Sequence, residues 1–194
     1  PEKLKELYPV DQIELRPNVS SEFRDKAREE LQGYYAHCTA IDSCVGDIHK
    51  TVEETGAAEN TIFVFTSDHG DMFGSQGKRP WRKQVPWDEA VRVPFLMRFP
   101  QIHDEGRTVS TPINTPDILP SLLSLCGITI PDSIEGEDLS ALFKGEFAGD
   151  DRAKLFMSVS PFVDEDFNAY RGLRTSRYSY VRDSDGPWLL YDNR

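Results

Sequence analysis

A short apolar run at residues 61–65 constrains the fold of this chain more than any other feature. Its sequence, TIFVF, is mostly β-branched and aromatic, so a strand built from it would be apolar on both faces. Such strands occupy the covered interior of a mostly parallel sheet, with helices on either side. A second run of this kind lies at residues 93–99, with Pro94 near its start. The two runs predict an α/β fold.

One long amphipathic helix is predicted to precede the first strand, between Ser20 and Gly56. Apolar residues recur in it at steps of three or four, so they share one face, and we expect that face to be buried. The residues of this face are Phe23, Ala27, Leu31, Tyr34, Cys38, Ile41, Val45, Ile48 and Val52. Residues 115–117 predict a second helix, because Thr115 can cap it, Pro116 suits its first position and Asp117 places an acid in its first turn.

The chain changes character near residue 150. Beyond it, short alternating segments are separated by turns rich in Asp, Ser and Gly, which is typical of an antiparallel meander. These segments lie at residues 155–160, 170–175, 178–182 and 189–191. We therefore expect an α/β part over residues 1–150 and a small antiparallel sheet over residues 151–194.

Charge and composition exclude several classes of protein. The chain has 22 Lys and Arg against 33 Asp and Glu, a net charge of −11, which argues against binding to nucleic acid or to an anionic membrane surface. Its apolar runs are too short to span a bilayer. Cys38, Cys44 and Cys126 form no CxxC pair and no zinc-binding spacing, so we expect them to be free and buried.

A polar sequence, Asp68-His69-Gly70, directly follows the first predicted strand. Ligand sites of open α/β sheets lie just beyond the carboxyl ends of strands, so these residues are site candidates. An ordinary strand-ending turn would use the same residue types. A basic stretch at residues 78–83 is the other candidate, because it stands out in so acidic a chain. It could attract an anionic substrate or be a solvated loop.

Several segments, in order along nearly the whole chain, resemble the sulfatase family of the alkaline phosphatase superfamily. Residues 60–74 resemble its metal-binding strand end. Lys83 with residues 87–94 resembles its "K…YEESVRVP" segment, and residues 115–123 resemble its "VDLAPTLLDLAG" segment. Residues 174–180 and 190–192 resemble its terminal "RTxRYKY…LYD" sheet. The fold implied is the C-terminal part of an α/β/α sandwich followed by a small antiparallel sheet.

The resemblance also implies a reaction and a set of site residues. Sulfatases of this family hydrolyse sulfate esters with a formylglycine nucleophile and a divalent cation. By resemblance, Asp68 and His69 are ligands of that cation, expected to be Ca²⁺, and Lys83 contacts the sulfate and the nucleophile. We expect Arg79, Trp81 and Arg82 to line the mouth of the substrate site.

Other family features are missing from these 194 residues. No Cys or Ser stands in the nucleophile pattern C/S-x-P/A-x-R, and the Asp-Asp metal pair that the family carries in its N-terminal part is missing. The chain thus resembles the C-terminal part of a sulfatase, and we expect it to hold an incomplete cation site and to be inactive alone.

Further expectations concern the parent enzyme and its partners. Its substrate would be a sulfated small molecule or glycan, and its location periplasmic or secreted. The chain itself could form homo-oligomers or associate through exposed sheet edges. A phosphonate or phosphate diester hydrolase of the same superfamily and a non-catalytic binding module are the alternatives.

Overall fold

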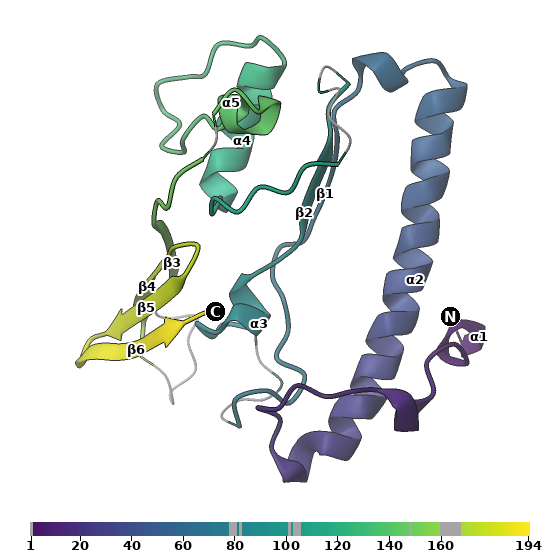
Figure 1. Ribbon diagram of the computed structural model, residues 1–194, viewed down its shortest axis with the longest axis vertical. Coiled ribbons are helices and arrows are strands. Elements are labelled where there is room, and N and C mark those ends of the chain that lie inside the picture. Colours follow the sequence, from purple (N-terminus) through teal and green to yellow (C-terminus); the bar gives the residue numbers. More distant parts are fainter. Residues whose placement is uncertain are drawn as a thin grey trace. The chain divides into compact units, whose positions relative to one another are not determined.

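The computed structural model describes residues 2–77, 81, 83–100, 102, 106–147, 149–159 and 168–194 (Figure 1). The chain divides into two compact units, Pro1–Pro100 and Gln101–Arg194. The elements of the first unit are α1 (Glu2–Lys5), η1 (Val10–Gln12), η2 (Ser21–Phe23), α2 (Arg24–Glu54), η3 (Ala58–Asn60), β1 (Phe63–Thr66), α3 (Asp88–Val91) and β2 (Phe95–Arg98). Those of the second are α4 (Thr115–Leu125), α5 (Ser140–Lys144), β3 (Lys154–Ser158), β4 (Tyr170–Arg174), β5 (Tyr178–Asp183) and β6 (Gly186–Asp192). Within the described part of the chain, no helix has the length and hydrophobicity that a membrane span requires.

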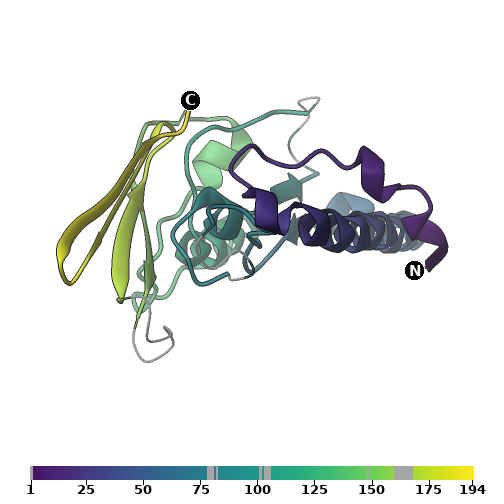
Figure 2. The same cartoon turned by 90° about the horizontal axis from the view of Figure 1, so that it is seen from below.

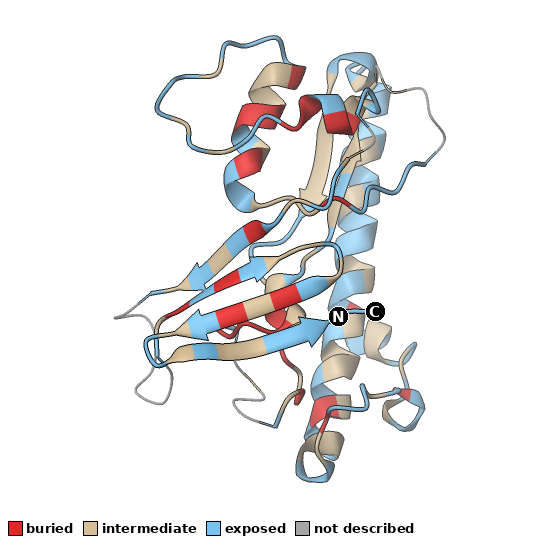
Figure 3. Cartoon of the chain, turned by 60° about the vertical axis from the view of Figure 1, so that its left-hand side comes forward, coloured by how far each residue is buried: buried red, intermediate tan, exposed pale blue. Residues whose placement is uncertain are grey.

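Helix α2 confirms the predicted long helix, but of its predicted buried face only Ala27 is fully buried. Its buried residues are Ala27 and Ala36. Tyr34, Ile41 and Ile48 are 48%, 47% and 54% exposed, and Figure 3 shows most of the helix exposed. The short elements α1, η1 and η2 lie against α2 (Figures 1 and 2). A periodic apolar pattern shows that one face is apolar, but it does not show what covers that face.

Strands β1 and β2 pair antiparallel, with Phe63 opposite Arg98 and Thr66 opposite Phe95. The sequence predicted a mostly parallel sheet here, so the direction of this pair is a correction. The predicted burial on both faces is wrong as well, because the residues of β1 and β2 are intermediate or exposed, Leu96 at 63%. The direction of pairing depends on the path of the chain between the strands. The side chain of Thr66 also donates a hydrogen bond of 2.9 Å to the carbonyl of Pro94.

The four-stranded sheet of the second unit has the order β3-β4-β5-β6 and is antiparallel throughout, which confirms the predicted meander. Tyr170 and Val181 are buried on one face. Phe156 and Trp188 contact Tyr170 edge-on, at centroid distances of 6.3 and 6.0 Å. Burial raises the pKa of Tyr170 to about 12.

The opposite face of this sheet is apolar and exposed. Cross-strand partners share a face, so the register places a row of apolar side chains there. They are Leu155, Met157, Leu173, Tyr178 and Leu190, all between 43% and 71% exposed. Figure 3 shows the resulting alternation of buried and exposed residues along the strands.

The two compact units meet in sequence at Pro100, so helices α4 and α5 belong to the same unit as the sheet. The boundary near residue 150 stays a prediction about domain organisation.

The prediction of free cysteines holds for Cys38, Cys44 and Cys126, but all three are exposed, so their predicted burial is wrong. Cys38 and Cys44 lie on the exposed helix α2, and Cys126 lies at the end of α4.

Helix α4 begins in a capping box, one residue earlier than the sequence predicted. Its N-cap is Asn114, whose side chain accepts a hydrogen bond from the N–H of Thr115 at 2.8 Å. The carboxylate of Asp117 accepts the N–H of Asn114 at 2.9 Å in return. Asn114 has the same capping chemistry as Thr115, which is why the sequence alone left the first residue of the helix undecided.

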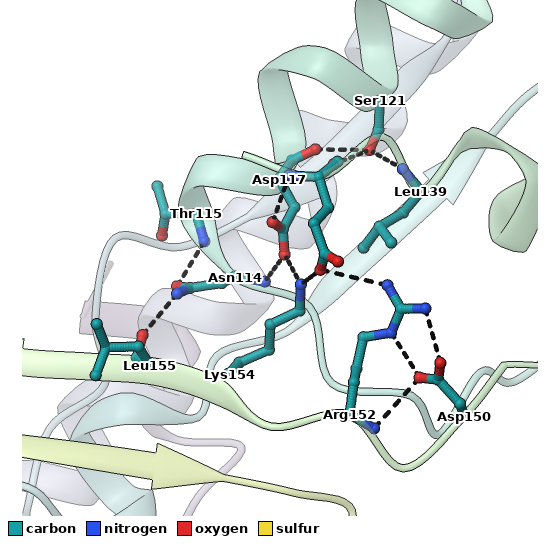
Figure 4. A network of polar contacts seen from close by, with 10 residues as sticks. Asn114, Thr115, Asp117, Ser121, Leu139, Asp150, Arg152, Lys154 and Leu155 are labelled. Atoms are coloured by element: carbon teal, nitrogen blue, oxygen red, sulfur yellow. Dashed lines mark hydrogen bonds and ion pairs between the residues drawn. The ribbon is translucent and has the colours of Figure 1, made fainter. Parts of the chain in front are cut away.

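Asp117 is the centre of a buried polar network (Figure 4). Only 4% exposed, it accepts the N–H of Glu137 at 3.0 Å and lies 2.8 Å from the ammonium of Lys154. Lys154 also forms an ion pair with Glu137. The hydroxyl of Ser121 donates to the carbonyl of Asp117 at 2.6 Å and accepts the N–H of Leu139 at 2.8 Å. The network joins the start of α4, the loop at residues 137–139 and strand β3.

The charges of this network support one another. The hydrogen bond from Lys154 lowers the pKa of Glu137. Burial would lower the pKa of Lys154, but its hydrogen bonds to Asp117 and Glu137 raise it above its ordinary value. A carboxyl whose pKa is lower in the folded state stabilises that state above its ordinary pKa, 4.5 for Glu137, and loses this effect as the pH falls through the folded value.

The substitution Lys154→Met should destabilise the chain, because it leaves the buried carboxylate of Asp117 without its ammonium partner. We expect the free energy of unfolding to fall by about 3 kcal/mol at pH 7, measured by urea denaturation. The loss of stability on acidification below pH 4.5 should become shallower, since Glu137 then gains less from ionisation, with Arg152 left as its ion-pair partner. Lys50→Met, at an exposed pair with Glu54, is the control and should cost at most about 0.5 kcal/mol. Equal effects of the two variants would contradict this assignment.

A second test concerns Gly136, where a Cβ atom would lie 1.8 Å from the carbonyl oxygen of Pro116. Gly136→Ala must therefore push the loop away from α4, and we expect a loss of about 1–3 kcal/mol in the free energy of unfolding. The control, Gly46→Ala in the interior of α2, meets nothing within 4 Å and should stabilise the chain by about 0.5–1 kcal/mol. Thermal unfolding followed by circular dichroism measures both, and a Gly136→Ala variant as stable as the wild type would be the contrary result.

Candidate functional site

The candidate site is the turn that follows strand β1. Its first side chain, Asp68, is 83% exposed and accepts hydrogen bonds from the backbone N–H of His69 at 2.9 Å and from the hydroxyl of Ser67 at 3.4 Å. The hydrogen bond from the His69 backbone lowers the pKa of Asp68. The turn therefore presents an ionised, largely exposed carboxylate at neutral pH.

His69 supplies a second donor atom beside this carboxylate. Its Nδ1 lies 2.8 Å from the carbonyl oxygen of Gly70, which can only accept, so Nδ1 carries the proton. In the tautomer with the proton on Nδ1, the ring has its lone pair on Nε2, which lies 3.4 Å from Oδ2 of Asp68. Two donors that each lie about 2.4 Å from one calcium-sized ion, at about a right angle, are about 3.4 Å apart, so this spacing fits neighbouring ligands of a single cation.

The pair is only part of a cation's coordination. Calcium takes about six to eight oxygen ligands, and one carboxylate with one imidazole cannot supply them. Across the described residues, no group of three or more His, Cys, Asp or Glu is placed to hold a metal ion. Asp68 and His69 could thus contribute two ligands, with the others coming from elsewhere.

The position of this turn depends on Gly70. Its N–H donates a hydrogen bond of 2.8 Å to the carbonyl of Ala90 in helix α3. A Cβ atom on Gly70 would lie 2.0 Å from the carbonyl oxygen of Glu89, so a residue with a side chain could not approach α3 as closely. The contact brings the Asp68–His69 turn to α3, the helix that begins shortly after Lys83 in the chain.

The other predicted site residues are only partly described. Lys83 is exposed, on the stretch that leads to α3. Trp81 packs edge-on against Phe23, with ring centroids 6.1 Å apart, and Lys26 Nζ lies 4.3 Å from the centroid of its ring. These contacts place Trp81 against the start of α2. Arg79 and Arg82 lie outside the described residues, so their predicted role at the substrate mouth stays a prediction.

The loop after the turn shows a feature that the sequence did not reveal. Met72 and Ser75 are each 1% exposed, and Phe73 and Gln76 have positive φ angles of 41° and 67°. Residues other than glycine rarely adopt such angles, so the surrounding contacts must impose them. Ser75 forms an isolated bridge with Val19 in the irregular segment before α2. No local pattern in the sequence indicates this pairing.

Comparison with known proteins assigns the chain to a family. Residues 6–128 match the family model described as Sulfatase, and residues 77–194 match the model described as N-sulphoglucosamine sulphohydrolase, C-terminal. A Formosa agariphila protein named as an ulvan-active sulfatase is 52% identical over 100% of the chain and 38% of its own length. An endo-4-O-sulfatase of Bacteroides thetaiotaomicron is 32% identical over 88% of the chain and 35% of its own length.

A solved structure shows the same fold. It is a Bacteroides thetaiotaomicron protein from work on the metabolism of multiple glycosaminoglycans, with a TM-score of 0.83 and 31% identity. The match covers 99% of this chain and 43% of that one, which confirms the expected alkaline phosphatase-like α/β fold with its small antiparallel sheet. The chain spans 35–38% of the length of the two curated relatives. On these matches, the chain belongs to the sulfatase family.

Proposed function

We propose that the full gene product hydrolyses sulfate esters of a sulfated glycan, and that this chain supplies part of its cation site. The observation that carries the proposal is the ionised carboxylate of Asp68 beside the Nε2 lone pair of His69, 3.4 Å apart at the end of a strand. The names of two relatives, an ulvan-active sulfatase and an endo-4-O-sulfatase, support this class of substrate.

Asp68 and His69 would hold a divalent cation, which we propose to be calcium. When bound, such an ion stabilises the negative charge that develops on the oxygens of the sulfuryl group. The hydrogen bond from the His69 backbone keeps Asp68 ionised, and the hydrogen bond to the carbonyl of Gly70 keeps the lone pair of His69 on Nε2. These contacts prepare both side chains for the ion before it arrives.

Lys83 would act on the same sulfuryl group. Its ammonium is a compact point charge, which suits an anion that presents several equivalent oxygens. A fixed cation aimed at developing charge is among the strongest contributions to catalysis. The nucleophile pattern C/S-x-P/A-x-R does not occur in these 194 residues, so we propose that residues outside them supply the nucleophile and that the 194 residues alone are inactive.

A direct comparison of substrates tests the proposed reaction. The full gene product, assayed on an aryl sulfate and on the matching aryl phosphonate ester, should show the higher kcat/KM on the sulfate. The reverse preference would identify a phosphonate or phosphate diester hydrolase, and no turnover of either ester would favour a non-catalytic binding module.

The substitution Asp68→Asn should weaken binding of the cation, because it replaces a charged ligand with a neutral amide. We expect the calcium Kd of the full gene product to rise at least about tenfold in isothermal titration calorimetry, and His69→Ala to have a similar effect. Asp71→Asn is the matched control. Asp71 is a neighbouring acid whose carboxylate accepts a hydrogen bond from the Phe73 backbone at 3.2 Å, and we assign it no role as a ligand. Its Kd should stay within about threefold of the wild type. If Asp71→Asn weakened binding as much as Asp68→Asn, the assignment of ligands would be wrong.

Lys83→Met should lower kcat on an aryl sulfate about 10²-fold or more, because it removes a charge that faces the sulfuryl group. Lys83→Arg should recover only part of this loss, since a planar guanidinium does not reproduce a point charge. Lys3→Met, at an exposed lysine of α1, controls for the loss of one positive charge. A variant at Lys83 that turns over like the Lys3 control would remove Lys83 from the site.

A further inference from the structure

Glu89 has a buried carboxylate that takes no part in the reaction proposed above. Its side chain is 6% exposed, accepts a hydrogen bond from Asn18 Nδ2 at 2.8 Å and lies 3.3 Å from Nη1 of Arg16. Both partners come from the irregular segment before α2. Taking a carboxylate out of water is costly unless it is paired and hydrogen-bonded, and Arg16 and Asn18 provide both.

The main chain around Glu89 holds the Asp68–His69 turn. The N–H of Gly70 donates to the carbonyl of Ala90 at 2.8 Å, and the carbonyl oxygen of Glu89 lies 2.0 Å from the position that a Cβ atom of Gly70 would take. Helix α3 has only four residues, so its own hydrogen bonds cannot fix its place. The side chain of Glu89 supplies an anchor for this short helix.

Asn18 connects the same segment to the far end of the site loop. Its side chain donates to Glu89, and its carbonyl accepts the N–H of Gln76 at 3.1 Å. The neighbouring residue, Val19, bridges to Ser75. The loop that begins with Asp68 and His69 is therefore held at two places, by α3 at Gly70 and by the segment before α2 at Gln76.

We propose that Glu89 is a positioning residue of the sulfatase reaction. Its side chain holds α3 to Arg16 and Asn18. Because α3 in turn holds Gly70, Glu89 fixes the position of the Asp68–His69 turn relative to Lys83, whose segment leads into α3. The inference rests on the proposed function, because it concerns the alignment of those residues for one sulfuryl group. Glu89 acts through them, and misplacing a reacting group by about 1 Å can cost about 10²-fold in rate.

The first test compares Glu89→Ala and Glu89→Gln in the full gene product. Glu89→Ala removes both contacts, and kcat on an aryl sulfate should fall at least about tenfold with KM within about threefold of the wild type. Glu89→Gln keeps an acceptor for Asn18 but loses the charge that faces Arg16. Its kcat should therefore lie between that of the wild type and that of Glu89→Ala. The control is Glu30→Ala, at an exposed position of α2, which should leave both parameters unchanged. A folded Glu89→Ala variant with the kcat of the control would overturn the proposal.

A second test needs no activity. Hydrogen exchange, followed by mass spectrometry or NMR, reports the opening of the contact between Gly70 and Ala90. In Glu89→Ala, protection of the Gly70 amide should fall at least about tenfold, while amides of the β4–β5 pair keep theirs. Equal loss at both places would mean global destabilisation, and unchanged protection would mean that Glu89 does not hold the turn; either result refutes the positioning role. If the wild type fails to hydrolyse sulfate esters, the proposed function fails, and the exchange result still decides whether Glu89 holds Gly70.

Discussion

The site in the first unit depends on the close approach of Gly70 to helix α3. Gly70 donates a backbone hydrogen bond to Ala90, and the neighbouring carbonyl of Glu89 leaves no room for a Cβ atom. Main-chain atoms are stiffer than side chains, so this contact places the Asp68–His69 turn more firmly than a salt bridge would. The exposed carboxylate and the imidazole beside it can then keep their spacing without being buried. Everything proposed about the site depends on this backbone contact.

Local patterns in the sequence predicted the elements well, because they depend on neighbouring residues. The apolar run at 61–65, the long helix and the alternating segments after residue 150 all correspond to elements of the structure. What failed depends on distant residues. The exposure of α2, the antiparallel pairing of β1 with β2 and the exposed thiols of Cys38 and Cys44 are set by what lies against each element.

The candidate site shows the same difference between features set by neighbouring residues and features set by distant ones. Asp68 and His69 could be found from the sequence, because a polar pair after an apolar run marks the end of a strand. The contact of Glu89 with Asn18 could not, since the two residues are 71 positions apart in the chain, and the motif that contains Glu89 does not indicate its partner. Asp117 is an intermediate case: its place in the first turn of a helix was predicted, whereas its partner Lys154 comes from a strand beyond α5.

The exposed apolar side chains of α2 and of the four-stranded sheet have a thermodynamic consequence. Heat capacity rises on unfolding because apolar surface enters water, by about 12–15 cal/mol/K per residue in ordinary globular domains. Ile41, Ile48 and Leu173 are already 47%, 54% and 45% exposed and Leu190 is 71% exposed, so unfolding adds less apolar surface for them than for buried side chains. We therefore expect the heat capacity of unfolding per residue to fall below that range, and the dependence of stability on temperature to be flatter than for an ordinary domain of the same length.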